Sequence, residues 1–216
     1  MLDLGCGVGH VLRILPQRLR CFGVDYSPAS LRLASRGLRT ASLAASSAYQ
    51  LPFRQSSFDA VICLEVLEHL ERDDEAVAEI ARVLKPGGRL VTSVPSTYYF
   101  PEYRDLMGHY RHYTPQTFAG LLARHGLAVD RFLNDYPRFN KMYFYVYATA
   151  EACNRMWNRI TGGRTSIYAR TLPWTTMRLY SGLLAPVLLP LRRLDENRRA
   201  RPTTFLVAQK QIGAEN

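Results

Sequence analysis

Apolar runs alternate with amphipathic stretches through the first 135 residues of the chain. Short apolar segments with the composition of buried strands occur at 1–4, 21–25, 58–64, 89–94 and 126–133. Helical spacing of apolar positions, or a helix-start signal, follows most of them, and predicts helices over 9–19, 28–37, 73–84 and 115–124. This alternation predicts an α/β fold with a doubly wound, mostly parallel sheet.

Capping residues and helix-breaking residues support these boundaries. Ser27-Pro28 and Thr114-Pro115 each place a capping hydroxyl before a proline that suits the first helical position. The sequence KPGG at 85–88 should end the helix before it, so that the next strand begins at residue 89.

The segment 136–202 breaks this alternation. It is rich in Tyr, Trp, Leu and Arg, and the run TTFLVAQK at 203–210 then predicts one last strand. We therefore divide the chain into a core at 1–135, an insertion of helical character at 136–202, and a final strand with a tail at 203–216.

Composition and charge refine this picture. The chain has 216 residues, of which 47% are hydrophobic, and its net charge is +10. The insertion holds 12 Lys and Arg against 3 Asp and Glu, so nearly all of the excess positive charge belongs to it. The four cysteines are scattered and the start has no secretory pattern, so a reducing, cytoplasmic location is expected.

A glycine-rich loop after the first strand suggests a cofactor site. Gly5, Gly7 and Gly9 follow the strand, and Asp25 ends the next one, where a carboxylate can accept ribose hydroxyls. This combination predicts a nucleoside cofactor, with NAD or FAD as one alternative. The spacing G-x-G-x-G departs from the dinucleotide pattern, and Asp3 suits an ammonium group, which favours S-adenosylmethionine (SAM).

With these motifs the chain resembles class I SAM-dependent methyltransferases, in particular the group that includes the ubiquinone-biosynthesis O-methyltransferases. The matching stretches are LDLGCGVG (2–9), GVDYSPASL (23–31), LPFRQSSFDAVICLEVLEHL (51–70), EIARVLKPGGRLVTSVP (79–95) and GHYRHYTPQTFAGLLARHGL (108–127). The resemblance implies a seven-stranded Rossmann-like sheet and a methyl transfer reaction. It also implies contacts to SAM from Asp3, Gly5, Gly7, Gly9, Asp25, Tyr26, Ser47, Ala48 and Leu64.

Two features depart from the family pattern. Ser47 stands where members often have an aspartate for the adenine amine, so the corresponding hydrogen bond should be weaker. Members also usually carry one or two helices before the first strand, which here has about four residues. Either the start is placed too late, or the cofactor site is more open than usual.

The acceptor side offers several roles for the same residues. Glu65, Glu68 and His69 have the spacing of one face of a helical turn, and His109 and His112 follow the fifth strand. By resemblance to E-x-x-E-H metal motifs, Glu65, Glu68, His69 and His112 could bind a divalent ion, with Mn, Fe or Zn preferred. Alternatively His69, with His109 and His112 nearby, supplies a general base without metal. The third interpretation is purely structural.

Two further residues stand beside the histidines. Arg111 and Tyr113 could hold an anionic or sugar-like acceptor, or else one is solvated and the other packed.

The insertion suggests partners of opposite charge. The apolar run 183–191, followed by an arginine cluster and preceded by aromatics, suits an anionic membrane surface and is too short to span a bilayer. RNA is a less favoured partner, and a helical cap over the acceptor pocket is the structural alternative.

The predicted function is methyl transfer from SAM to a small or lipid-linked acceptor, at oxygen. The alternatives are a metal-assisted RNA ribose methyltransferase and a non-catalytic relic of the fold. The sequence names neither the acceptor nor the oligomeric state.

Overall fold

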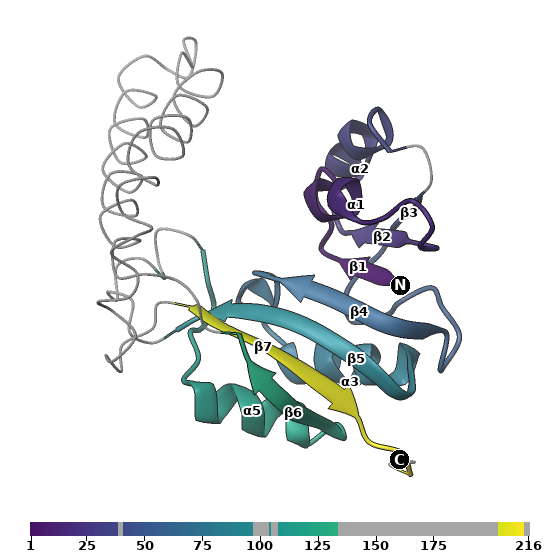
Figure 1. Cartoon of the computed structure of the whole chain (residues 1–216). Helices are drawn as coiled ribbons and strands as arrows, with labels where there is room; N and C mark the ends of the chain where they lie inside the picture. The colour runs from purple at the N-terminus through teal and green to yellow at the C-terminus, as the bar shows by residue number, and fades with distance from the viewer. Residues whose placement is uncertain (39–40, 97–103, 105–107, 134–202, 214–216) are drawn as a thin grey trace, which may run out of the picture. The chain divides into compact units, whose positions relative to one another are not determined.

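A computed structural model describes residues 1–38, 41–96, 104, 108–133 and 203–213. The stretches 1–134 and 203–216 belong to one compact unit (Figure 1). Predictions for 136–202 lie outside the described residues, including its role as a basic insertion.

The sheet has seven strands in the order β3-β2-β1-β4-β5-β7-β6. The strands are β1 (Leu2–Leu4), β2 (Phe22–Asp25), β3 (Ser42–Ala45), β4 (Phe58–Leu64), β5 (Leu84–Pro95), β6 (Leu127–Phe132) and β7 (Thr203–Lys210). All neighbours are parallel except β7, which pairs antiparallel with both β5 and β6. The predicted doubly wound, mostly parallel α/β sheet is confirmed.

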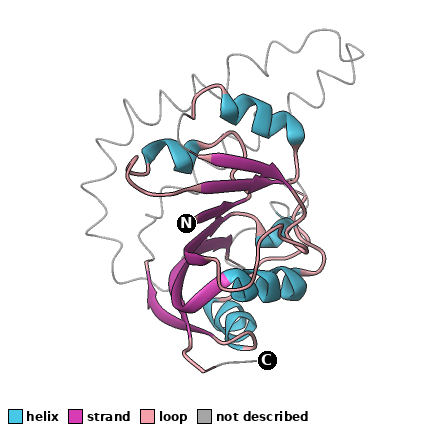
Figure 2. Cartoon of the chain, turned by 90° about the vertical axis from the view of Figure 1, so that its right-hand side faces the viewer, coloured by secondary structure: helices cyan, strands magenta, loops and turns pink. Residues whose placement is uncertain are grey.

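Helices cover both faces of this sheet. The helices are α1 (His10–Ile14), α2 (Pro28–Ser35), α3 (Asp73–Val83) and α5 (Pro115–Ala123), with a 3-10 turn over Leu67–His69. Figure 1 shows α1 and α2 on one side of the sheet and α3 and α5 on the other, and Figure 2 gives the same layers from the side. This arrangement places the loops that follow β1, β2 and β4 at one edge of the sheet.

Local signals set the helix starts as expected. The Ser27 hydroxyl accepts a hydrogen bond from the Ser30 amide at 3.2 Å, which caps α2. Thr114 and Thr117 form a reciprocal capping box at the start of α5, with Pro115 in the first helical position.

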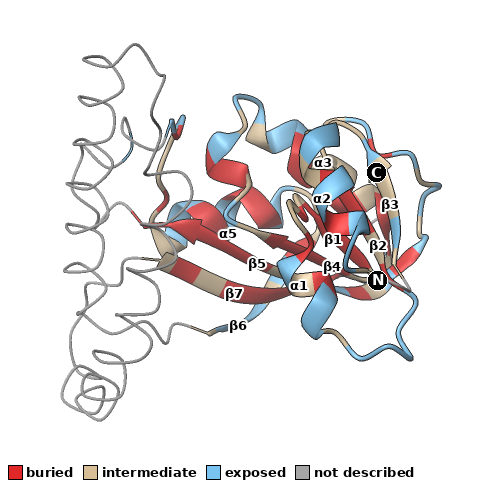
Figure 3. Cartoon of the chain, turned by 90° about the horizontal axis from the view of Figure 1, so that it is seen from above, coloured by how far each residue is buried: buried red, intermediate tan, exposed pale blue. Residues whose placement is uncertain are grey.

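The hydrophobic core lies between the sheet and the inner faces of the helices, where Figure 3 shows the buried residues. Phe22 of β2, Phe58 of β4 and Phe53 pack edge to face with ring centroids 4.8–5.7 Å apart. On the inner face of α3, Val77 and Ile80 are fully buried in the same core, as their helical spacing predicted.

Three element boundaries differ from the sequence prediction. The strand β3 was not predicted, because its four residues are half-buried or exposed at the sheet edge and carry little apolar signal. The first helix ends at Ile14, before Pro16. The strand β5 begins at Leu84, so the KPGG turn lies within the strand as a local irregularity opposite Phe58–Ala60.

No described helix has both the length and the apolar content needed to cross a bilayer.

Candidate functional site

The glycine loop after β1 is built from left-handed backbone. Gly5, Gly7 and Gly9 have φ angles of +74°, +51° and +81°, a region that disfavours other residues. A Cβ on Gly5 would lie 2.3 Å from Val66 Cγ2, whereas a Cβ on Gly7 would meet no atom within 4 Å. The loop is therefore packed against the protein at Gly5 and faces open space at Gly7.

Asp25 ties this loop to the end of β2. Its Oδ2 accepts the Gly7 amide at 2.8 Å, and its Oδ1 accepts the Ser27 amide at 2.8 Å. A carboxylate offers about four acceptor positions, so each oxygen still has a lone pair for a ligand hydroxyl.

Asp3 lies inside the same edge of the sheet. Its side chain is 3% exposed, and its Oδ2 has no hydrogen-bond partner among the described residues. Burial, and then the nearby negative charge of Asp25, raise the pKa of Asp3 to about 6. A buried carboxylate oxygen without a donor is costly unless a bound cation or donor supplies the contact.

The remaining predicted cofactor residues surround this edge. Tyr26 is 84% exposed. The Ser47 hydroxyl accepts the Tyr49 amide at 3.2 Å, and Ala48 is half-buried against the core. Leu64 ends β4 and is half-buried. None of these placements tests the predicted contacts to SAM, which stay predictions.

Two glutamates follow β4. Glu65 has a φ of +54°, and its Oε1 accepts the Ser93 hydroxyl at 2.7 Å. Burial raises the pKa of Glu65. Glu68 is fully buried, and neither of its carboxylate oxygens has a hydrogen-bond partner among the described residues. Burial, with the charge of Glu65, raises the pKa of Glu68 to about 9.

Three histidines gather beside Glu68. The rings of His69 and His109 meet edge to face with centroids 4.5 Å apart, and His109 Nδ1 lies 3.0 Å from His112 Nε2. Burial lowers the pKa of all three, that of His109 to about 4. His69 is the most accessible, with 43% of its side chain exposed, whereas His109 is buried.

The possible metal ligands form a different set from the predicted one. Ligand atoms of Glu68, His69 and His109 lie within 4.8 Å of one another. Glu65 and His112, which the sequence suggested, lie outside this group: Glu65 precedes the 3-10 turn and points to Ser93, and His112 reaches the group through His109. The expected shared face of Glu65, Glu68 and His69 on one helical turn is absent.

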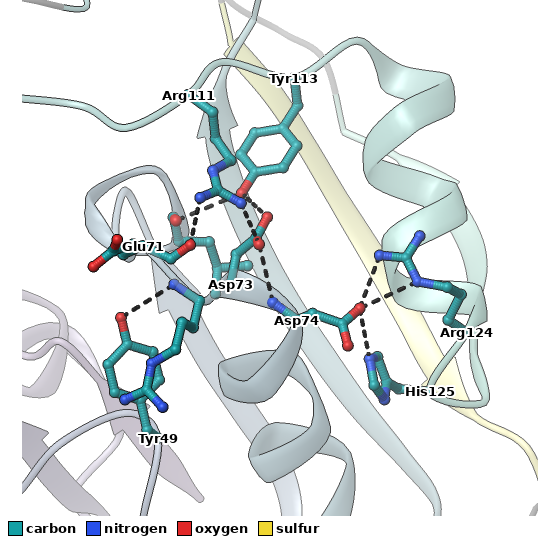
Figure 4. A network of polar contacts seen from close by, with 10 residues as sticks. Tyr49, Glu71, Asp73, Asp74, Arg111, Tyr113, Arg124 and His125 are labelled. Atoms are coloured by element: carbon teal, nitrogen blue, oxygen red, sulfur yellow. Dashed lines mark hydrogen bonds and ion pairs between the residues drawn. The ribbon is translucent and has the colours of Figure 1, made fainter.

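Arg111 and Tyr113 are already engaged with protein groups (Figure 4). The Arg111 guanidinium pairs with Asp73, and donates to the Glu71 carbonyl at 2.5 Å. The buried Tyr113 hydroxyl donates to Asp73 Oδ2 at 2.7 Å. Both residues therefore bind the start of α3, and the idea that they hold an acceptor has no geometric support.

Comparison with known proteins identifies the domain. Residues 2–92, which include the glycine loop, Asp25 and the Glu68-His69 turn, match the family described as a methyltransferase domain. Over these residues the chain is similar to SAM-dependent methyltransferases.

The names of proteins similar to this domain indicate different substrates. The uncharacterized methyltransferase YcgJ of Bacillus subtilis is 35% identical over 42% of this chain and 38% of its own. The mouse protein called probable tRNA methyltransferase 9B is 37% identical over 43% of this chain and 21% of its own. The tocopherol O-methyltransferase of Arabidopsis thaliana is 32% identical over 42% of this chain and 28% of its own.

Each of these sequence matches spans well under half the length of the relative. The crystal structure of YcgJ superposes with a TM-score of 0.61, covering 98% of this chain and 92% of the other at 20% identity. That likeness supports the fold.

The methyltransferase site agrees with a SAM ligand on its own geometry. The open space at Gly7 admits a ligand close to the backbone, Asp25 retains acceptor positions, and one Asp3 oxygen has no hydrogen-bond partner within the described part of the chain. These three features lie at the carboxyl ends of β1 and β2, where ligands of such sheets bind.

The sequence analysis did not find two residues of this edge. Val66 closes on the glycine loop, and Asp73 receives Arg111 and Tyr113. The only sequence signal at Asp73 is that it is an acidic residue in the first turn of a predicted helix. Such a residue ordinarily indicates a favourable interaction with the helix dipole and nothing more.

Proposed function

We propose that the chain is a SAM-dependent methyltransferase that acts on a small or lipid-linked acceptor, at oxygen. The observation that supports it most is the link between Asp25 and the glycine loop. The Asp25 carboxylate orients the Gly7 amide and retains acceptor capacity, at the edge where one Asp3 oxygen lacks a partner among the residues that the structure describes. A nucleoside with an ammonium group at its other end satisfies both.

The residues of this edge have separate tasks in the proposed reaction. When bound, SAM supplies a methyl group on a positively charged sulfur. Asp3 would attract the ammonium group of its methionine part, and Asp25 would accept the ribose hydroxyls. The acceptor oxygen forms a bond to the methyl carbon as the carbon–sulfur bond breaks, and the electron pair stays on sulfur.

His69 is the proposed base for the acceptor proton. It is the most exposed of the three histidines, and burial lowers its pKa, so it is neutral and able to accept a proton at neutral pH. His109 and His112 lie behind it and would orient the ring or pass the proton onward.

A divalent cation is a second candidate for the same task. Glu68 has two buried oxygens without partners among the described residues, and it lies with His69 and His109 in one group. Mixed carboxylate and imidazole donors suit Mn, Fe or Zn. Calorimetry with Mn²⁺ alone, on the wild type and on Glu68→Gln, tests this hypothesis. The wild type should bind Mn²⁺, and the affinity of Glu68→Gln for Mn²⁺ should be at least tenfold lower. Equal heats in the two proteins would leave His69 as the base without metal.

The acceptor class rests on weaker grounds and is tested directly. The names of the relatives include both tRNA and tocopherol methylation, so they do not choose between the alternatives. The basic segment 136–202 supports an anionic membrane surface on the cytoplasmic side. Product assays should find methylation of phenolic acceptors in anionic vesicles, and none of transfer RNA. Methylated RNA would favour the alternative.

Cofactor binding is the first experiment. Isothermal calorimetry with S-adenosylhomocysteine should show one site, and NADH should show none at the same concentration. The absence of S-adenosylhomocysteine binding would support the non-catalytic relic.

A further inference from the structure

We infer that Asp73 is a positioning residue: its carboxylate holds the segment 108–113, which carries His109 and His112, against the Glu68-His69 turn. The predicted effect on turnover rests on the proposed function, whereas the predicted placement of the segment 108–113 does not depend on it.

Two segments far apart in the sequence form the histidine cluster. The first follows β4 and contains Glu68 and His69; the second precedes α5 and contains His109 and His112. Three backbone groups link the segments: the Tyr110 amide donates to the Glu68 carbonyl at 2.8 Å, the Gly108 backbone hydrogen-bonds the His69 ring, and the Leu67 carbonyl lies 3.5 Å from the Tyr113 hydroxyl. None of these bonds holds the side chains on both sides of His112, and a charged attachment there would fix the orientation of the histidine rings.

Asp73 provides this charged attachment. It is the first residue of α3, its side chain is 13% exposed, and both of its oxygens are used by the second segment. Oδ1 pairs with Arg111 and Oδ2 accepts the Tyr113 hydroxyl at 2.7 Å, as Figure 4 shows. These two partners flank His112 in sequence, so the carboxylate grips the segment on both sides of that histidine.

The partners of Asp73 are themselves fixed. Arg111 also donates to the Glu71 carbonyl at 2.5 Å, on the first segment. The ring of Tyr113 is buried 5.1 Å from that of Phe118, and its amide donates to the Pro95 carbonyl at 3.1 Å. Burial and the Asp73 carboxylate raise the pKa of Tyr113, so its hydroxyl remains a donor over the whole physiological range. The attachment is therefore rigid on both sides.

The neighbouring residue is a matched control. Asp74 stands in the same first turn of α3, but 54% of its side chain is exposed. It pairs with Arg124 at 2.8 Å and His125 at 3.2 Å, both at the far end of α5 (Figure 4). Replacing either aspartate removes the same charge from the same helix terminus, and only Asp73 contacts the histidine segment.

The test compares Asp73→Asn with Asp74→Asn in the full chain. With ¹³C-labelled histidine, the nuclear Overhauser effect between the His69 and His109 rings should be present in the wild type and in Asp74→Asn, and lost in Asp73→Asn. The kcat of Asp73→Asn should fall about tenfold to a hundredfold, with the KM for SAM unchanged; Asp74→Asn should stay within about twofold of wild type.

Partner variants distinguish positioning from folding. Tyr113→Phe removes one oxygen atom and keeps the buried ring, so it should fold and still lower kcat, by less than Asp73→Asn. It replaces Asp73→Asn if that variant does not fold. Arg111→Gln should cost less in the Asp73→Asn background than in the wild type, because the pair between Asp73 and Arg111 is already broken there and only the bond to the Glu71 carbonyl is lost.

An unchanged ring-to-ring signal in Asp73→Asn or, if it is unfolded, in Tyr113→Phe would overturn the inference. If the wild type turns over no acceptor, the proposed function fails, and the histidine signal alone decides on Asp73.

Discussion

The Asp25 carboxylate and the Gly7 amide, 18 residues apart in sequence, are joined by a 2.8 Å hydrogen bond that links the ends of β1 and β2. The other oxygen of Asp25 receives the Ser27 amide at the start of α2. One side chain thus sets the shape of the glycine loop and the entrance of the next helix, and it is also the expected ribose contact.

Asp25→Asn should weaken S-adenosylhomocysteine binding at least tenfold in calorimetry. The amide has one acceptor oxygen, so the variant loses the contact to Gly7 or to Ser27 as well as acceptor positions for the ribose; hydrogen bonds to a charged group contribute about 1.5–3 kcal/mol each. The control is Asp59→Asn, which alters an exposed aspartate of β4 that pairs with Lys85 of β5. This variant should bind S-adenosylhomocysteine as the wild type does. An affinity of Asp25→Asn within twofold of wild type would refute the ribose assignment.

Alanine at Gly5 and at Gly7 should have opposite consequences. Gly5→Ala combines a left-handed φ with a clash against Val66 and should lower the free energy of unfolding by about 2–4 kcal/mol. Gly7→Ala meets no protein atom and should cost only about 1 kcal/mol, yet it should impair ligand binding, since its methyl group enters the open space. Urea denaturation and calorimetry separate the two effects.

The clash is tested by a compensating change. Val66→Ala added to Gly5→Ala should restore part of the lost stability, because it removes the atom that the new Cβ would meet. If Val66→Ala adds its full cost instead, the two residues do not interact as described.

Asp3→Asn should stabilise the protein at alkaline pH and impair cofactor binding. The folded-state pKa of Asp3, about 6, lies above its ordinary value of 3.8, so its contribution to stability is present below pH 4 and is lost as the pH rises through 6. The full penalty is roughly 3 kcal/mol at 1.36 kcal/mol for each pKa unit. Thermal unfolding should show a higher melting temperature for the variant at pH 8 and no gain at pH 4.

The same ionisation should govern the ligand. An ammonium group favours the charged form of Asp3, so the affinity of wild type for S-adenosylhomocysteine should decrease as the pH falls below about 6. Asp3→Asn should bind weakly without this pH step. A pH-independent wild-type affinity between pH 5 and 8 would count against the ammonium contact.

Lys210→Met should destabilise the contact between the end of β7 and the end of α3. The buried Lys210 ammonium donates to the carbonyls of Ala81 and Leu84 at 2.7 and 2.9 Å, which are acceptors at the end of α3. Removing it leaves two buried carbonyls without this donor and should lower the free energy of unfolding by about 1–3 kcal/mol. Lys85→Met, at an exposed pair with Asp59, is the control and should unfold at the same urea concentration as wild type.

Local pattern was sufficient for most of the fold. The strands β4 and β7 lie at the predicted residues, and Ser27 and Thr114 cap their helices, because apolar runs, capping hydroxyls and prolines act over a few neighbouring residues. The glycine loop and Asp25 were recognisable as a cofactor site for a similar reason: both stand at strand ends, and the alternation of elements already places those ends at one edge.

The sequence by itself therefore determined the doubly wound sheet and the chemistry at its first two strand ends. Only the tertiary structure decided which acceptor-side residues meet. His109 joins Glu68 and His69 while Glu65 turns to Ser93. Asp73 holds Arg111 and Tyr113, which are 38 and 40 residues away in sequence. Such contacts depend on the packing of separate segments and on a left-handed residue after β4, and neither is encoded in the spacing of residues along the chain.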